Sequence, residues 1–252
     1  MKRLRAILRG IGLIFNLIRQ VAPLAIRPLF KGFDLPWALG VRKKWVWRTF
    51  RLLGVKVEMQ GTPPTGVCVL VGNHRSYLDP VVVLRDISVV PVAKAELAAW
   101  TLIGYGAKAS GVMFVKRESK TSRAATLEAM REVLRLGYPV LVYPEGTTHI
   151  LPTTMELRPG AFRLAVKEGV PIVPVALDYA DLGDAWIGDD TFIPHFLRCF
   201  GKKTTWVKIR YGQPIVSESA DEIIQTARQW IDESMLELRR EFDREGRTVT
   251  AE

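Results

Sequence analysis

Two residues of the sequence have the types and the spacing for acid–base chemistry. His74 and Asp79 stand five residues apart, where an apolar strand-like run gives way to a short helical pattern. A carboxylate about one helical turn after a histidine can hold the imidazole in one tautomer, which leaves the other ring nitrogen free to accept a proton from a hydroxyl group. The pair therefore indicates a general base.

Three further segments contain strand-like apolar runs that end at polar or glycine-containing turns. They are Gly111–Arg117, Val142–Thr148 and Val170–Leu177. In open α/β sheets, ligands bind beyond the carboxyl ends of the strands, and His74, Arg117 and Glu145 each follow such an end. The apolar residues themselves are what any buried strand would contain, so the functional signal lies in the strand ends.

In this order, the four blocks resemble the glycerolipid acyltransferase family, whose best-known members acylate lysophosphatidic acid. The resemblance covers roughly residues 55–180. It implies transfer of a fatty acyl group from acyl-CoA or acyl carrier protein to the free hydroxyl of a lysophospholipid, with lysophosphatidic acid, which would become phosphatidic acid, as the first expectation. It also implies that His74 is the base, that Asp79 holds and charges its ring, and that the turn of Glu145, Gly146 and Thr147 shapes the acceptor site.

The same resemblance implies which groups the reaction does not need. A thioester is already activated, so the enzyme needs a base, a grip on the thioester carbonyl and donors for the developing oxyanion. No nucleophilic serine or cysteine is required, and no metal or cofactor is expected beyond the thioester co-substrate. Ser76 is therefore interpreted as a turn or helix-cap residue.

An acceptor that carries a phosphate needs fixed cations near His74. Lys94 matches a lysine that family members often carry, Arg117 closes the second block, and Arg158 stands just before a helix whose N-terminus would add positive potential. Each could instead be a solvated charge. Thr148 departs from the family pattern, because many members that use lysophosphatidic acid have Arg there. Some relatives with Thr act on other lysolipids, so a lyso-aminolipid such as lyso-ornithine lipid is the alternative acceptor.

The net charge of +10 is concentrated at the N-terminus. Residues 1–60 hold 13 Lys or Arg against Asp34 and Glu58, a net charge of +11, whereas the remaining residues carry −1. The first basic residues alternate with Leu, Ile and Phe, and they are Arg3, Arg5, Arg9 and Arg19. A second stretch, Val41–Leu53, repeats the pattern with two Trp, a residue favoured at membrane boundaries.

This segment predicts attachment to a membrane. Polar residues interrupt the first apolar run and Pro23 and Pro28 follow it, which does not favour a spanning helix. A basic amphipathic helix can lie in the interface instead, with arginines at anionic headgroups. We therefore expect contact with membrane lipids at the cytoplasmic face of the cell membrane. Packing of these helices on the domain is the alternative, and a cleaved signal peptide is disfavoured because basic residues recur beyond the apolar centre.

Beyond residue 54, strands and helices alternate, which predicts an α/β fold with a mostly parallel or mixed sheet flanked by helices. Strands are expected near residues 55–60, 67–73, 88–93, 111–116, 139–144, 171–178 and 205–211, the first and last being candidates for antiparallel pairing. Helices are expected near 77–86, 96–105, 121–136, 159–168 and 219–242. Residues 181–201 predict a long loop over one edge of the sheet. We expect residues 1–54 to bind the membrane and residues 55–252 to form the acyltransferase domain.

Two function classes besides an enzyme fit parts of the sequence. The pI of about 9.8 suggests a nucleic-acid binder, but the arginines alternate with apolar residues and no nucleic-acid-binding module is recognised, so no nucleic-acid partner is expected. A non-catalytic membrane scaffold would have no need of His74, Asp79 and Glu145 together. Cys68 and Cys199 form no disulfide or metal pattern, which favours a reducing compartment. The oligomeric state stays open.

Overall fold

The computed structural model describes residues 1–32, 34–95, 98, 101–115 and 120–248. A seven-stranded sheet forms the centre, in the order β1-β7-β6-β2-β5-β3-β4. The strands are β1 (Val55–Gln60), β2 (Val69–Gly72), β3 (Val90–Lys94), β4 (Met113–Val115), β5 (Val140–Val142), β6 (Ile172–Tyr179) and β7 (Thr205–Tyr211). All pairings are parallel except β6 with β7. The predicted mixed α/β sheet is confirmed, with β1 and β7 antiparallel to the other five strands.

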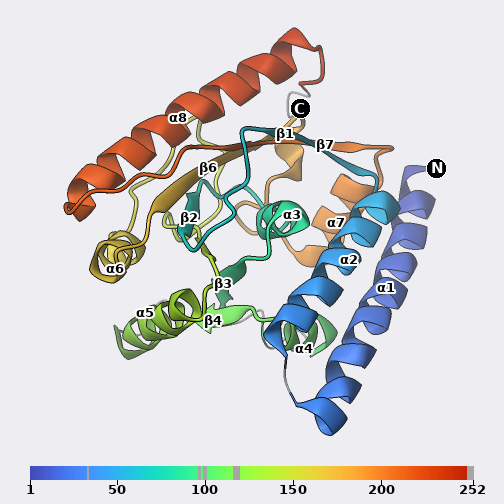
Figure 1. Cartoon of the computed structure of the whole chain (residues 1–252). Coiled ribbons are helices and arrows are strands. Elements are labelled where there is room, and N and C mark those ends of the chain that lie inside the picture. The colour runs from blue at the N-terminus through green and yellow to red at the C-terminus, as the bar shows by residue number, and fades with distance from the viewer. Residues whose placement is uncertain (33, 96–97, 99–100, 116–119, 249–252) are drawn as a thin grey trace.

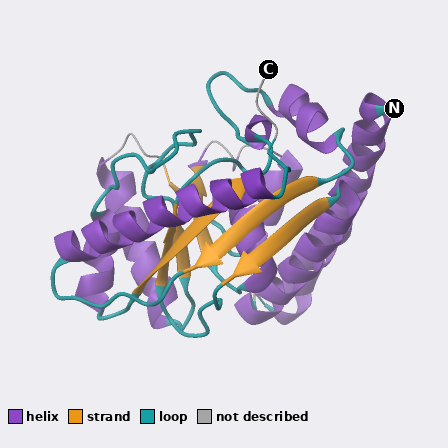
Figure 2. Ribbon diagram, turned by 90° about the horizontal axis from the view of Figure 1, so that it is seen from above, coloured by secondary structure: helices purple, strands orange, loops and turns teal. Residues whose placement is uncertain are grey.

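Helices cover both faces of this sheet (Figures 1 and 2). They are α1 (Lys2–Lys31), α2 (Leu35–Leu53), α3 (Asp79–Asp86), α4 (Thr101–Ala109), α5 (Lys120–Arg135), α6 (Gly160–Glu168), α7 (Phe192–Phe200) and α8 (Ala220–Arg244). One buried apolar cluster joins the sheet to α2, α3 and α7, and a second joins it to α5, α6 and α8. Because side chains alternate along a strand, β6 sends Val173 and Leu177 to the first cluster and Ile172 and Ala176 to the second.

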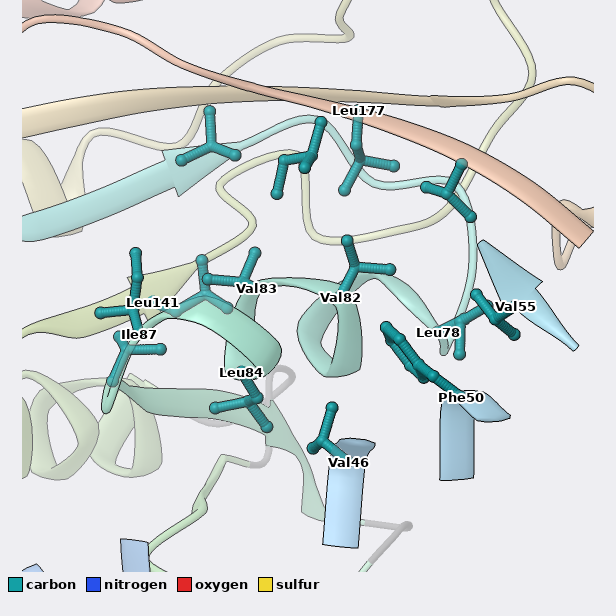
Figure 3. Packing of buried hydrophobic residues seen from close by; sticks show 14 of the residues in the cluster. Val46, Phe50, Val55, Leu78, Val82, Val83, Leu84, Ile87, Leu141 and Leu177 are labelled. Atoms are coloured by element: carbon teal, nitrogen blue, oxygen red, sulfur yellow. The ribbon is translucent and has the colours of Figure 1, made fainter. Parts of the chain in front are cut away.

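The first cluster holds α3 in place directly after the His74 segment. Figure 3 shows Val82 and Val83 of α3 packed between the sheet and α2, with Phe50 beside Leu78. These side chains are almost fully buried, and burying an aliphatic side chain contributes about 1.5 to 3 kcal/mol. The short helix that begins at Asp79 is thus fixed by its apolar face.

The prediction of a long loop over residues 181–201 is wrong. A short 3₁₀ turn, η2 (Leu182–Asp184), and α7 form there. Pro194 is the third residue of α7, where the backbone N–H has no intrahelical acceptor, so the proline does not break the helix. Phe196 and Phe200 are buried in the first cluster. The apolar periodicity of α7 extends over only two turns and lies among Asp, Gly and Pro residues, so it was too short to predict a helix.

The N-terminal segment forms one helix, α1, that continues through Pro23 and Pro28. By length and composition, α1 is long and apolar enough to cross a membrane, although the core helices of soluble proteins and signal sequences can have the same length and composition. Only 22% of its most apolar 18-residue stretch is buried. The two prolines do not end the helix.

Most large apolar side chains of α1 point outward, whereas the buried side chains include the polar Asn16 and Gln20 beside Leu17 and Leu24. Asn16 and Gln20 are buried, and Asn16 Nδ2 donates to Thr49 Oγ1 of α2 at 2.9 Å. The exposed side chains are Leu4, Ile7, Leu8, Ile11, Ile14, Phe15, Ile18, Ile26, Leu29 and Phe30. A helix that packed its apolar face on the domain would show the reverse arrangement. We call these ten residues the α1 apolar face.

Two of the N-terminal arginines bind the protein itself. Arg5 Nη1 donates to Gly201 O at 2.9 Å, and Arg9 Nη1 donates to Phe200 O at 3.0 Å. These carbonyls lie at the C-terminus of α7, where the helix dipole favours cations. The expectation that all four arginines reach lipid headgroups is therefore too broad, and Arg3 and Arg19 are the exposed ones.

Candidate active site

The end of β2 places His74 at the carboxyl edge of the sheet. Asn73 is fully buried, and its side chain donates to Leu177 O and accepts from Leu177 N, both at 2.9 Å. This pair of bonds extends the pairing of β2 with β6 by one residue. The chain then turns, and α3 begins at Asp79, five residues after His74.

The Asp79 carboxylate fixes the imidazole of His74. Asp79 Oδ2 lies 2.7 Å from His74 Nδ1 and accepts from the backbone N–H groups of Arg75 at 2.6 Å and Ser76 at 2.8 Å. An ionised carboxylate can only accept, so Nδ1 carries the proton and Nε2 keeps a lone pair. Asp79 is completely buried, and the His74 side chain is 15% exposed. The free nitrogen can thus meet a substrate hydroxyl.

Two tyrosines complete the surroundings of this pair. Tyr179 OH, at the end of β6, donates to Asp79 Oδ1 at 2.6 Å. Burial, and then the charge of Asp79, raises the pKa of Tyr179 well above its ordinary value, so it stays a donor. The ring of Tyr143 stacks on the His74 ring, with centroids 4.2 Å apart. The sequence did not identify either residue, although Tyr179 also closes a strand at its carboxyl end.

The turn after β5 carries Glu145 and Gly146. Gly146 has a φ of +77°, a conformation that favours glycine. A Cβ there would lie 2.8 Å from the Arg158 guanidinium carbon, and Arg158 N donates to Pro144 O at 3.0 Å. Gly146 is therefore needed both for the turn and for the close approach of Arg158. Glu145 is buried, and Thr147 is exposed.

Backbone bonds join the Glu145 turn to the His74 turn. His149 N donates to His74 O at 3.1 Å, and Trp186 N donates to Arg75 O at 2.8 Å. The hydroxyl of Thr148 in turn donates to Trp186 O. Trp186 lies in the segment for which a plain loop was predicted, and it contacts both turns. Thr148 is thus engaged within the protein.

A cavity of about 710 Å³ opens beside the Glu145 turn. Tyr143 and Gly146 line it from the site, and Arg158 and Arg163 add positive charge. Its apolar wall consists of Val92, Leu127, Met130, Val142 and Ala161. The cavity therefore combines aliphatic surface with guanidinium groups.

The three predicted cationic residues differ in what the structure describes of them. Arg158 lies against Gly146 of the Glu145 turn. Lys94 is the last residue of β3, and Arg117 lies outside the described residues. Among the predicted site residues, the structure thus brings together His74, Asp79, Glu145, Gly146, Thr147 and Arg158.

Comparison with known proteins gives relatives over the same region. The acyltransferase family model matches residues 54–178. A lyso-ornithine lipid O-acyltransferase of Pseudomonas aeruginosa is 29% identical over 91% of this chain and 93% of that protein. A 1-acyl-sn-glycerol-3-phosphate acyltransferase alpha of Mus musculus is 33% identical over 50% of this chain and 46% of that protein, so the matched region spans about half of the mouse protein.

The fold also matches a solved structure. The crystal structure of a 1-acyl-sn-glycerophosphate acyltransferase from Thermotoga maritima aligns with a TM-score of 0.69. The alignment covers 95% of this chain and 98% of that chain at 21% identity. At this identity the match establishes the fold.

Proposed function

Since the chain belongs to the acyltransferase family, we propose that it transfers a fatty acyl group from acyl-CoA or an acyl carrier protein to the free hydroxyl of a lysolipid. The observation that carries this proposal is the His74–Asp79 pair, whose Nδ1–Oδ2 distance is 2.7 Å. It supplies a base of one defined tautomer at the carboxyl edge of the sheet, where ligands bind in α/β folds.

In this mechanism His74 moves one proton. Nε2 takes it from the acceptor hydroxyl while the hydroxyl oxygen forms a bond to the thioester carbonyl carbon. Asp79 stabilises the imidazolium that results. The tetrahedral intermediate then breaks its carbon–sulfur bond, and the leaving thiolate takes the proton from His74. The products are the acylated lipid and a free thiol, so no covalent acyl-enzyme is needed.

Two lysolipids with different headgroups are candidates for the acceptor. Lysophosphatidic acid is the expectation from the sequence, and the cations at Lys94, Arg117 and Arg158 support it. Lyso-ornithine lipid is supported by two observations: the Pseudomonas relative matches over nearly its whole length, and Thr148 bonds Trp186 O at the position where many lysophosphatidic acid enzymes carry Arg. These observations outweigh the cation argument, and we propose lyso-ornithine lipid as the preferred acceptor and lysophosphatidic acid as the second candidate.

An acceptor panel tests this choice. Wild-type protein and the Thr148→Arg variant are assayed with lysophosphatidic acid, lysophosphatidylcholine, lysophosphatidylethanolamine and lyso-ornithine lipid. We expect lyso-ornithine lipid to give the highest wild-type kcat/KM. Thr148→Arg should lower that value roughly 10- to 100-fold, because the bond to Trp186 is lost and an unpaired charge is introduced.

The matched control for this panel is Thr148→Ser, which keeps the hydroxyl and should retain most of the activity. Wild-type preference for lysophosphatidic acid, together with a gain for that lipid in Thr148→Arg, would reverse our order of acceptors. Such a gain would be about tenfold or more for a well-placed contact to phosphate.

We further propose that the α1 apolar face enters the cytoplasmic leaflet of the cell membrane. Its large side chains are exposed, whereas the polar Asn16 and Gln20 face the protein. Arg3 and Arg19 on the same helix are exposed and can approach anionic headgroups. This placement would bring a site for a lysolipid acceptor close to the membrane that supplies it.

Binding to vesicles tests the α1 apolar face. We expect the protein to sediment with anionic vesicles and to stay partly bound in 1 M salt, where the Debye length falls to about 3 Å and exposed charges are screened. Ile11→Asp combined with Phe15→Asp should weaken binding at least 100-fold, since each buried apolar side chain contributes about 1.5 to 3 kcal/mol. Leu136→Asp, at an exposed apolar residue outside α1, is the control. Complete release of wild-type protein by salt alone would contradict apolar insertion.

A further inference from the structure

His149 is a buried residue next to the Glu145 turn, and its backbone contacts the His74 turn. Its N–H donates to His74 O at 3.1 Å, and its carbonyl accepts from Arg75 Nη1 at 3.0 Å. The residue thus lies between the segment of the proposed base and the segment of Glu145.

The ring of His149 has a defined tautomer. Its Nδ1 accepts a hydrogen bond from the backbone N–H of Leu151 at 3.1 Å. A nitrogen that accepts cannot carry the proton, so in the neutral ring the proton is on Nε2. That nitrogen contacts Glu145 Oε2. His149 therefore presents its only ring N–H to the Glu145 carboxylate.

Glu145 depends on this contact for its orientation. Its side chain is fully buried, and apart from the close contact of Oε2 with His149 Nε2 neither carboxylate oxygen has a hydrogen-bond donor among the described residues. A buried carboxylate needs donors, because desolvation otherwise disfavours it. Within the described part of the chain, the side chain in close contact with this carboxylate is that of His149, and it leaves Oε1 for a further donor.

We propose that His149 is a positioning residue that holds Glu145 in the acceptor site and keeps the Glu145 turn in register with His74. This inference rests on the proposed acyl transfer, in which Glu145 shapes the acceptor site. It adds a residue that was not identified from the sequence. The signal was present in the spacing of Glu145 and His149, which stand four residues apart in the sequence.

Substitutions of His149 test separately the ring N–H that faces Glu145 and the ring nitrogen that accepts from Leu151. His149→Leu removes both ring nitrogens, and kcat/KM for the acceptor should fall roughly 10- to 100-fold, the size expected when a reacting group is displaced by about 1 Å. His149→Gln keeps an N–H donor that can reach Glu145 and should recover most of the rate. His149→Asn can still accept from Leu151 N–H but is too short to reach Glu145, so it should resemble the Leu variant. If the Leu variant does not fold, the Asn variant carries the test.

A double-mutant cycle tests whether His149 acts through Glu145. In a Glu145→Gln background, His149→Leu should change kcat/KM by less than about threefold, because the contact is already altered. The KM for the lysolipid should rise while the KM for the thioester stays constant. Equal effects of His149→Leu in both backgrounds would overturn the proposal. Thr205→Val is the control, since Thr205 Oγ1 donates to Cys199 O at 3.3 Å; it should lower stability without changing KM.

Nitrogen NMR of the wild-type protein gives a readout independent of activity. His149 should show a protonated Nε2 and an unprotonated Nδ1, and the opposite tautomer would overturn the inference. Lack of activity with every acceptor of the panel would instead contradict the proposed function. An active enzyme whose KM values do not respond to His149→Leu would contradict the positioning role alone.

Discussion

His74→Ala is expected to lower kcat by a factor of roughly 10² to 10⁴, the contribution of a positioned general base. Asp79 Oδ2 holds Nδ1 of His74, which leaves Nε2 free to accept the proton. The fold should persist, because His74 is partly exposed and, among the described residues, the contacts of its side chain are the Asp79 bond and the stacking on Tyr143. Steady-state rates with the preferred lysolipid and thermal unfolding of the same preparation measure both statements.

Ser76→Ala is the matched control for this variant. Ser76 bonds Asp79 through its backbone N–H, which alanine retains. We expect less than a tenfold loss of rate, in contrast with a serine nucleophile, whose removal would abolish turnover. Retention of a tenth or more of the wild-type rate by His74→Ala would show that another group serves as the base.

The sequence predicted the parts of the site that lie within one segment. His74 and Asp79 are five residues apart, and the turn at Gly146 follows directly on a buried strand, so local patterns were sufficient. Tyr179 and Trp186 were missed because their contacts to the His74 segment depend on the pairing of distant strands. Tyr179 bonds a carboxylate 100 positions earlier in the chain, and no local periodicity encodes that distance.

The N-terminal helix shows a second limit of sequence patterns. Alternation of basic and apolar residues predicted an amphipathic helix, but a pattern does not say which face the domain covers. The buried face contains Asn16, which bonds Thr49 of α2, and Gln20. Arg5 and Arg9 bind carbonyls at the end of α7, a helix that was not predicted. The buried face of α1 and the partners of its arginines both depend on tertiary contacts, which a local pattern does not contain.

Asp79→Asn should lower kcat by roughly 10³-fold for a reason that the structure specifies. Oδ2 accepts from the Arg75 and Ser76 backbones and lies against His74 Nδ1, whereas Oδ1 meets Tyr179 OH. An asparagine that keeps its oxygen at the Oδ2 position retains the first three bonds, and its amide can donate to the Tyr179 oxygen. The imidazole keeps its orientation, and what is lost is the negative charge opposite the imidazolium.

The expected loss of kcat in Asp79→Asn follows from the lost negative charge. The Tyr179→Phe variant separates the effect of this charge from the effect of a hydrogen bond to Asp79. Two unit charges about 4 Å apart interact by about 4 kcal/mol at an effective dielectric constant of 20, which is roughly a thousandfold in rate. Tyr179→Phe removes one bond to Asp79 but leaves the carboxylate, so it should cost roughly tenfold to a hundredfold. Rates and unfolding temperatures of the two variants, measured together, test this order. A loss in Asp79→Asn no larger than that in Tyr179→Phe would mean that the carboxylate orients the ring without stabilising its charge.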